Sequence, residues 1–418
     1  MRLTPSTRRR CACAWSAALV AIAGSRAQAQ TPAQTTPDQP DRALIQQLQK
    51  RVDELEQQVK DLQAQAAEER QAAERAAEAP AQPPEGMRDM LTPLGLGGLQ
   101  IRGFNDIDFH AYRDNGQVNT FSLGQLDLFL SSRLASDFST IGEVVFEADE
   151  NNGFGVDVER LLLQYSPNDW FSLGVGRFHT AIGFYNTAYH HGNWFQTATG
   201  RPFIFRFEDN GGILPVHGVG VTVQGQIPSG AAGLHYVAEI ANGRRSGSPG
   251  DEPVQNVEDE NAHKALNFAL ITRPTRVLGL QAGISVYRDR LEPADRPAID
   301  ETIAAVHFVY QIPVFEQLAE AIFIRHVPSD TDRATTTTTF YTQTSRQLGR
   351  YRPYFRYEYL DAPPGPVFGN DLGRSYGPTI GVRFDAAPPV AIKVEYVRLT
   401  GSIRAQTNGL TVQFGFTF

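Results

Sequence analysis

The sequence predicts an all-β fold, a transmembrane antiparallel β-barrel of 16 strands preceded by an N-terminal coiled-coil helix. Three observations carry this prediction: an alternating strand at the C-terminus, repeated short segments of the same alternation from residue 99 onward, and an export signal at the N-terminus. At the C-terminus, polar or small residues share one face of the strand and apolar residues share the other, namely Leu410, Val412, Phe414, Phe416 and Phe418.

Residues 1–29 have the pattern of a secretory signal peptide. Arg8, Arg9 and Arg10 form a positive region, residues 11–24 are apolar and uncharged, and Ala27-Gln28-Ala29 is a small-residue cleavage site. The alternative is a membrane anchor, but the apolar run is short for crossing a bilayer. The only two cysteines lie in this segment, so the mature chain is expected to hold no disulfide and no thiolate metal ligand.

Residues 43–79 are predicted to form a coiled-coil oligomerisation helix, between a flexible spacer at 30–42 and a proline-containing linker at 80–98. The apolar residues recur in alternating steps of three and four, which is the heptad pattern. They are Ile45, Leu48, Val52, Leu55, Val59, Leu62 and Ala66. Alone, this pattern favours two strands, but the symmetry of a barrel assembly can override it. The alternative is an amphipathic helix that lies on the barrel or on a membrane.

Residues 99–418 are predicted to form an outer-membrane β-barrel. About fifteen candidate strands occur there, each with period-two alternation and each followed by turn or loop residues. Because bacterial single-chain barrels close with an even number of strands, we predict 16 strands, with 14 as the alternative. Clear examples are the segments 126–130, 144–148, 219–223, 234–240, 278–286, 304–310 and 392–396.

The charged residues of these strands are predicted to line the lumen, because a charge that faces hydrocarbon at the bilayer midplane is costly. In residues 350–359 aromatic side chains occupy one face and charged ones the other. The alternative is that the charges pair with one another and stiffen the wall. The predicted pore-lining residues are Arg102, Arg133, Arg160, Arg350, Arg352, Arg356, Arg383, Lys393, Asp106, Asp127, Glu143, Glu147, Glu358 and Glu395.

The stretch from Arg177 to Pro215 breaks the strand rhythm and is rich in aromatic residues. We predict a constriction loop folded into the lumen, with a subunit contact as the alternative. Several histidines in and near it suggest a metal site, but no carboxylate lies among them at ligand spacing, so no metal is predicted. The residues assigned to the constriction loop are Phe184, Tyr185, His190, His191 and Trp194.

Charge and motifs exclude several function classes. Without residues 1–29 the chain keeps 33 basic and 46 acidic residues, a net charge of −13 that argues against nucleic-acid binding. No apolar stretch reads as a transmembrane helix. No Gly-x-Ser-x-Gly nucleophile motif and no phosphate-binding glycine loop occur, so neither catalytic residues nor a cofactor are predicted.

The alternating strands, the C-terminal phenylalanine and the signal peptide resemble those of a Gram-negative porin. The heptad helix resembles the periplasmic coiled coil of sugar-type and dicarboxylate-type porins. Gly176-Arg177-Phe178 and the irregular segment after it are similar to the phosphate-selective porin group of the O and P type. That resemblance implies a homotrimer of 16-stranded barrels with an in-folded loop. The lysine clusters of the group are missing, since Lys264 and Lys393 are the only lysines in the barrel region.

We therefore predict an outer-membrane porin, a passive diffusion channel for small polar or anionic solutes, with its N-terminal helix in the periplasm. The predicted partners are outer-membrane lipid, other copies of the chain in a homotrimer, and the solutes. One alternative is a structural protein that tethers the envelope through its periplasmic coiled coil. Another is a barrel enzyme, for which no recognisable motif is present.

Overall fold

The computed structural model describes Lys50 and residues 98–418, except 114–117, 149–152, 190–191, 209–210, 247–256, 332, 370–371 and 402–406. The predicted signal peptide, spacer, coiled-coil helix and linker therefore lie outside the described residues, apart from Lys50 and Gly98. The chain divides into two compact units, 1–87 and 88–418, and the second holds every described strand.

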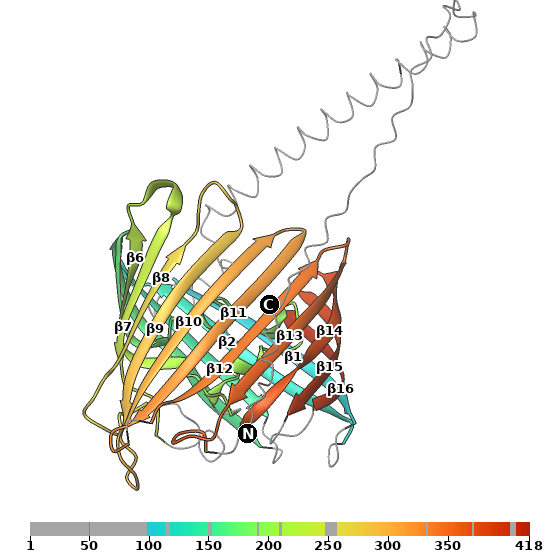
Figure 1. The fold of residues 1–418 in the computed structure, drawn as a ribbon. Coiled ribbons are helices and arrows are strands. Elements are labelled where there is room, and N and C mark those ends of the chain that lie inside the picture. Colours follow the sequence, from blue (N-terminus) through green and yellow to red (C-terminus); the bar gives the residue numbers. More distant parts are fainter. Residues whose placement is uncertain are drawn as a thin grey trace, which may run out of the picture. The chain divides into compact units, whose positions relative to one another are not determined.

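Sixteen strands form one closed antiparallel barrel (Figure 1). Each strand pairs with its neighbours in sequence, and β1 closes the ring by pairing with β16, with Phe104 opposite Thr417 and Tyr112 opposite Gly409. The fold class and the predicted number of 16 strands are thus confirmed. The strands are β1 (Leu99–Tyr112), β2 (Thr120–Arg133), β3 (Phe138–Ala148), β4 (Phe154–Asn168), β5 (Phe171–His179), β6 (His217–Ile227), β7 (Leu234–Ala241), β8 (Ala265–Thr272), β9 (Leu280–Leu291), β10 (Ile299–Ile312), β11 (Phe315–Pro328), β12 (Thr335–Arg346), β13 (Tyr351–Ala362), β14 (Gly373–Ala387), β15 (Val390–Gly401) and β16 (Thr407–Thr417).

The period-two alternation of the sequence separates the outside of the barrel from its inside. On β16, Phe414 is 42% exposed on the outer face, whereas its neighbour Gln413 is 1% exposed. On β15, Val394 is 43% exposed and Lys393 is fully buried. Successive side chains of a strand point to opposite faces, so the barrel presents apolar residues outward and encloses polar ones.

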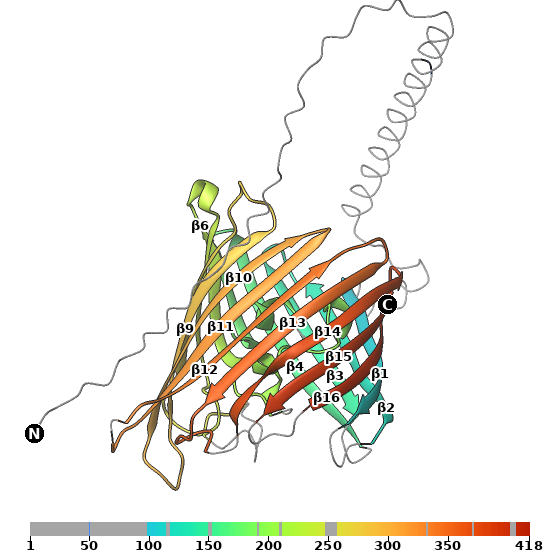
Figure 2. The ribbon, with the colours of Figure 1, turned by 45° about the vertical axis from the view of Figure 1, so that its right-hand side comes forward.

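The connection between β5 and β6 is long and irregular, and we call residues 180–216 the inner loop. Its described residues include the short helix α3 (Tyr185–Ala188) and the 3-10 turns η2 (Asn193–Phe195) and η3 (Phe203–Phe205). Another 3-10 turn, η5 (Gly230–Ala232), joins β6 to β7. Figure 2 shows the strongly tilted strands that surround this segment.

Among the described residues, no helix is both long enough and apolar enough to cross a membrane.

The backbone of β5 approaches β4 very closely at Gly176. This residue has φ +137°, and a Cβ atom added to it would lie 2.0 Å from the Leu161 carbonyl oxygen. We therefore expect Gly176→Ala to lower the free energy of unfolding by about 1–3 kcal/mol, because the left-handed conformation and the clash both strain alanine. Equilibrium urea unfolding in detergent measures this change.

Gly155→Ala on β4 is the matched control, since a Cβ atom there meets nothing within 4 Å. Equal effects of the two substitutions would contradict the assigned backbone geometry.

Candidate functional site

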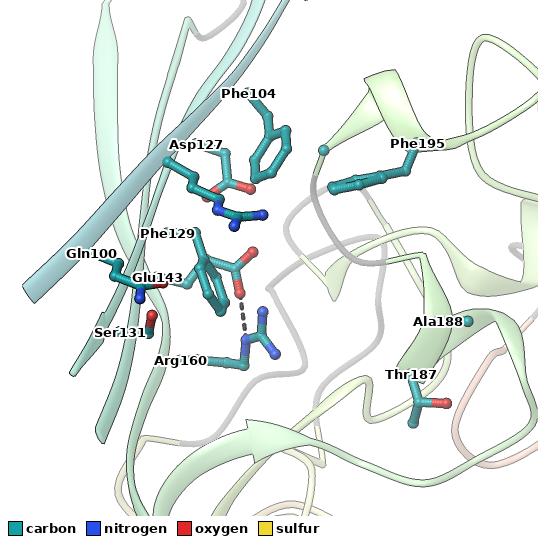
Figure 3. Close-up of a pocket in the computed structure, with 12 residues that line it drawn as sticks. Gln100, Phe104, Asp127, Phe129, Ser131, Glu143, Arg160, Thr187, Ala188 and Phe195 are labelled. Carbon is teal, nitrogen blue, oxygen red and sulfur yellow. Dashed lines mark hydrogen bonds and ion pairs between the residues drawn. The ribbon is translucent and has the colours of Figure 1, made fainter. Parts of the chain in front are cut away.

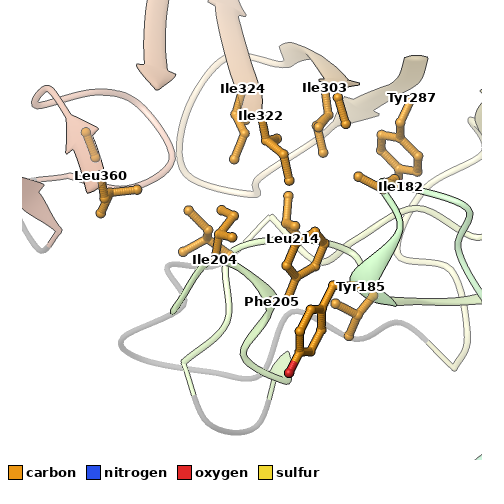
Figure 4. Close-up of a cluster of buried hydrophobic side chains, with 14 of the residues drawn as sticks. Ile182, Tyr185, Ile204, Phe205, Leu214, Tyr287, Ile303, Ile322, Ile324 and Leu360 are labelled. Atoms are coloured by element: carbon orange, nitrogen blue, oxygen red, sulfur yellow. The ribbon is translucent and has the colours of Figure 1, made fainter. Parts of the chain in front are cut away.

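The inner loop packs its apolar side chains against one side of the barrel interior. Figure 4 shows loop residues facing inward-pointing residues of β9, β10, β11 and β13. All of them are buried, so the contact forms a hydrophobic core inside the barrel. The loop residues are Ile182, Tyr185, Ile204, Phe205 and Leu214, and the wall residues are Tyr287, Ile303, Ile322, Ile324 and Leu360.

Buried carboxylates of the wall accept hydrogen bonds from backbone N–H groups of the inner loop. At the start of α3, Glu320 on β11 accepts hydrogen bonds from the amides of Phe184, at 2.6 Å, and Tyr185, at 2.9 Å. It also accepts one from the hydroxyl of Tyr341 at 2.7 Å. Further carboxylates do the same elsewhere: Glu239 accepts from Ala181, Glu358 from Phe203, and Glu395 from Thr199. Irregular backbone has no ladder partners of its own, so these side chains satisfy it.

Buried cations of the wall donate to the loop carbonyl oxygens. Arg356 donates to Gly200 at 2.8 Å. Lys393 Nζ donates to Asn193 at 2.5 Å and to Ala198 at 2.8 Å. Arg356 is 4% exposed and Lys393 is fully buried, so both act on the loop. That these two residues line the passage stays a prediction.

These contacts come from β7, β11, β13 and β15, which lie at different places around the ring. A segment that reaches inward-facing residues on all of these strands must lie within the lumen. Of the two placements considered from the sequence, the contacts favour the in-folded loop.

Three of the five residues assigned to the constriction loop can be placed. Phe184 and Tyr185 are buried against the wall, and the Tyr185 hydroxyl donates to Gln196 Oε1 at 2.8 Å. Burial raises the pKa of Tyr185, so its phenol is neutral. The Trp194 carbonyl oxygen accepts from Arg383. His190 and His191 lie outside the described residues.

Arg201 links distant parts of the inner loop to one another. Its guanidinium donates to the carbonyl oxygens of Tyr189, at 2.7 Å, and Phe205, and it lies 4.2 Å from the centre of the Phe207 ring. Burial lowers the pKa of Arg201 to about 10, which still leaves the side chain charged at neutral pH. Sequence reasoning did not single out this residue.

Two of the histidines that suggested a metal site, His179 and His217, lie beside carboxylates. His217 Nε2 lies 2.7 Å from Glu159 and its Nδ1 lies 3.0 Å from Glu208 on the inner loop. His179 Nε2 lies 3.8 Å from Glu143. Within the described part of the chain, no three His, Cys, Asp or Glu side chains gather in a way that suits a metal ion.

Open space remains beside the inner loop, in cavities lined by residues of β1–β9 and, for one of them, of β13, β15 and β16. The Phe104 cavity, of about 410 Å³, lies between Phe104, Asp127 and Arg160 on the wall and Phe195 on the loop (Figure 3). The Asp106 cavity, of about 480 Å³, begins at the next inward-facing residue of β1. A third cavity, of about 620 Å³, shares Arg160 with the first. Because they share or adjoin lining residues, the three cavities follow one another along the wall.

Charges of both signs lie beside these cavities. The wall carries buried carboxylates at Asp106, Asp127 and Glu143, of which Glu143 accepts from Arg160 Nε at 2.5 Å. Arg102 lies on the same wall, and Arg201 and Arg206 lie on the loop side of the Asp106 cavity. The space between wall and loop is therefore lined by both carboxylates and guanidinium groups.

The remaining predicted pore-lining residues occupy different environments. Glu147 accepts from Gln125 at 2.9 Å on the free wall, and Arg102 lines the Phe104 cavity. Arg352 donates to Gln347 at 2.5 Å. Arg133 is exposed at the end of β2, and Arg350 is exposed in the turn before β13, outside the strand. None of these placements tests a role in transport.

Comparison with known proteins identifies the fold. No family model matches the chain, and neither does any curated protein sequence. Many solved structures are similar, and three of them illustrate the likeness. The outer-membrane channel DcaP of Acinetobacter baumannii is 12% identical with a TM-score of 0.56, and OmpF of Salmonella typhi in complex with daunomycin is 10% identical with a TM-score of 0.54. The anion-selective porin from Comamonas acidovorans is 12% identical with a TM-score of 0.51. The matches cover 77% of this chain and 97%, 97% and 99% of those chains, respectively. At such identities the likeness is one of fold.

The Glu320 carboxylate holds the start of α3, so we expect Glu320→Gln to loosen the inner loop. The side-chain amide of the introduced glutamine has one acceptor oxygen for three donors, and its NH₂ group would face hydrogen-bond donors. The free energy of unfolding should fall by about 1–3 kcal/mol. Hydrogen–deuterium exchange of the Phe184 and Tyr185 amides should become faster.

Asp361→Asn is the control, because Asp361 pairs with Arg374 at an exposed position, where an ion pair contributes about 0–1 kcal/mol. Unchanged exchange in the Glu320 variant would refute the proposed anchoring of the loop.

Proposed function

We propose that the protein is an outer-membrane porin, a passive diffusion channel for small polar solutes. The observation that carries the proposal is the closed 16-strand barrel with apolar residues outside and with polar cavities between its wall and the inner loop. Solutes would cross by diffusion through water, without energy coupling and without chemical change. The protein is thus proposed to be a channel and not an enzyme.

Charges of both signs line the cavities of the proposed channel. Arg356 donates to the loop backbone and also lines the Asp106 cavity, whereas Lys393 is fully buried against the loop. The carboxylates of Asp106, Asp127 and Glu143 line the cavities as well. We therefore propose polar solutes in general as the cargo, with anions as one class among them.

We further propose that the chain forms a homotrimer in the outer membrane and that residues 43–79 associate as a periplasmic coiled coil. The heptad repeat supports this part of the proposal, because its apolar stripe needs a partner. The similarity to the phosphate-selective porin group also remains a proposal, and phosphate selectivity is not part of it, because only two lysines lie in the barrel region.

Planar-bilayer recording of the purified protein tests the channel. We expect stepwise conductance increases in groups of three. A protein that conducts no current but binds isolated peptidoglycan would refute the channel and favour the tether.

If the apolar outer face contacts lipid, a charge at its centre should be costly. Val306 lies near the middle of β10 and is 46% exposed on that face. We expect Val306→Arg to lower the free energy of unfolding in lipid vesicles by about 2–4 kcal/mol. Val306→Leu at the same position controls for size and should change it little. Similar values for both would argue against a lipid-facing position.

If the inner loop sets the narrowest part of the passage, loosening it should change the current. Arg356→Gln removes the guanidinium that holds the Gly200 carbonyl oxygen. We expect higher current noise in the open channel, because the loop moves more freely beside the passage. Arg350→Gln, at an exposed position in a turn, is the matched control. Wild-type noise in the Arg356 variant would exclude the loop as the constriction.

A further inference from the structure

The Phe104 cavity combines three kinds of surface that the channel function alone does not require. Figure 3 shows Asp127, Glu143 and Arg160 on the strand side and Phe195 across the cavity on the loop side. Arg102 belongs to the same strand wall and its side chain is exposed. The cavity therefore offers acidic, basic and aromatic groups within about 410 Å³. That volume lies in the range of small-molecule pockets, about 300–1,000 Å³.

One carboxylate oxygen of the acidic part has no hydrogen-bond donor among the described residues. Two carboxylates lie side by side on β2 and β3, and Arg160 donates to Glu143 at 2.5 Å. Asp127 is 2% exposed, and its Oδ1 atom accepts no hydrogen bond from the described residues. A buried carboxylate oxygen without a donor is unfavourable, and most such atoms in proteins are satisfied. An ammonium group in the cavity would supply the missing donor.

The aromatic part is preformed. The rings of Phe104 on β1 and Phe195 on η2 have centroids 4.6 Å apart and planes tilted by 48°. Gly192 allows this contact, because a Cβ atom there would lie 2.9 Å from Phe195 and 3.1 Å from Phe104. Phe195 nevertheless stays 52% exposed, so the pair offers apolar surface to a solute.

We propose that the Phe104 cavity is a binding site for amphoteric solutes of the amino-acid type. The solute's ammonium group donates to Asp127, its carboxylate accepts from Arg102, and its apolar or aromatic side chain packs on Phe104 and Phe195. The proposal deepens the channel function on which it rests, because such a site would select a class of cargo within the passage.

A simpler arrangement competes with this one. Arg102 pairs with Phe129 and Phe104 pairs with Asp127 across β1 and β2, so Arg102 and Asp127 are diagonal neighbours in the sheet. If the arginine side chain turned to Asp127, the two groups would satisfy each other. A test must therefore separate a solute site from a cross-strand ion pair.

Three probes share one phenyl ring and differ only in charge: phenylalanine, phenethylamine and 3-phenylpropionate. We measure their binding to the purified full-length protein by calorimetry in detergent, and their block of the current in planar bilayers. Phenylalanine should bind tightest, about tenfold or more above each singly charged probe, since each charged contact contributes about 1.5–3 kcal/mol.

Variants assign each contact. Asp127→Asn should weaken the binding of phenylalanine about tenfold, so that phenylalanine no longer binds more tightly than 3-phenylpropionate. In the Arg102→Gln variant, phenylalanine should no longer bind more tightly than phenethylamine. Arg133→Gln is the matched control, because Arg133 is an exposed arginine at the end of β2 that does not line the cavity. Heat-induced mobility shifts on gels verify that each variant forms the barrel.

The outcomes separate this proposal from the channel itself. Normal conductance without binding of any probe would support the channel function and overturn the proposed binding site. Equal binding of phenylalanine and phenethylamine, or unchanged binding in the Arg102 variant, also overturns it. Binding that follows the expected order in a protein that conducts no current supports the site and refutes the channel.

Discussion

The structure depends on one constraint, the need to satisfy the polar backbone of an irregular segment enclosed by a barrel. The described residues of the inner loop form only short helical turns, so most of their N–H and C=O groups have no regular partner. Acidic and basic side chains of the wall supply the partners, Glu320 for the amides at the start of α3 and Arg356 and Lys393 for carbonyl oxygens. Hydrogen bonds are strong in a site from which water is excluded.

This constraint divides the lumen into two halves with different chemistry. On the packed side, the inward faces of β9–β13 carry isoleucine, leucine and tyrosine residues that form a core with the loop. Elsewhere, polar and charged residues of the wall lie beside open cavities. The loop thus decides which wall charges border open space.

Much of the fold could be predicted from the sequence. The alternation of Phe414 with Gln413, or of Val394 with Lys393, depends only on the pleat of a strand, and the structure follows it residue by residue. The partners of the inward charges could not be predicted in this way. Lys393 and Arg356 share the parity of pore-lining residues, yet their donors point into the loop backbone. One available signal was missed: β10 and β11 are apolar on both faces, as with Ile303 beside Val306, which is expected only where both faces are covered.

By itself, the sequence determined the barrel and the side of the wall to which each residue belongs, because both follow from local periodicity. It left 14 strands as an alternative to 16, and the closed ring of the structure decided the number. Only the tertiary structure decided which inward residues face open space and which lie under the inner loop. Glu320 lies 2.6 Å from the Phe184 amide although the two residues are far apart in the chain. No local pattern records such a contact, because it arises from where the closed ring brings distant side chains together.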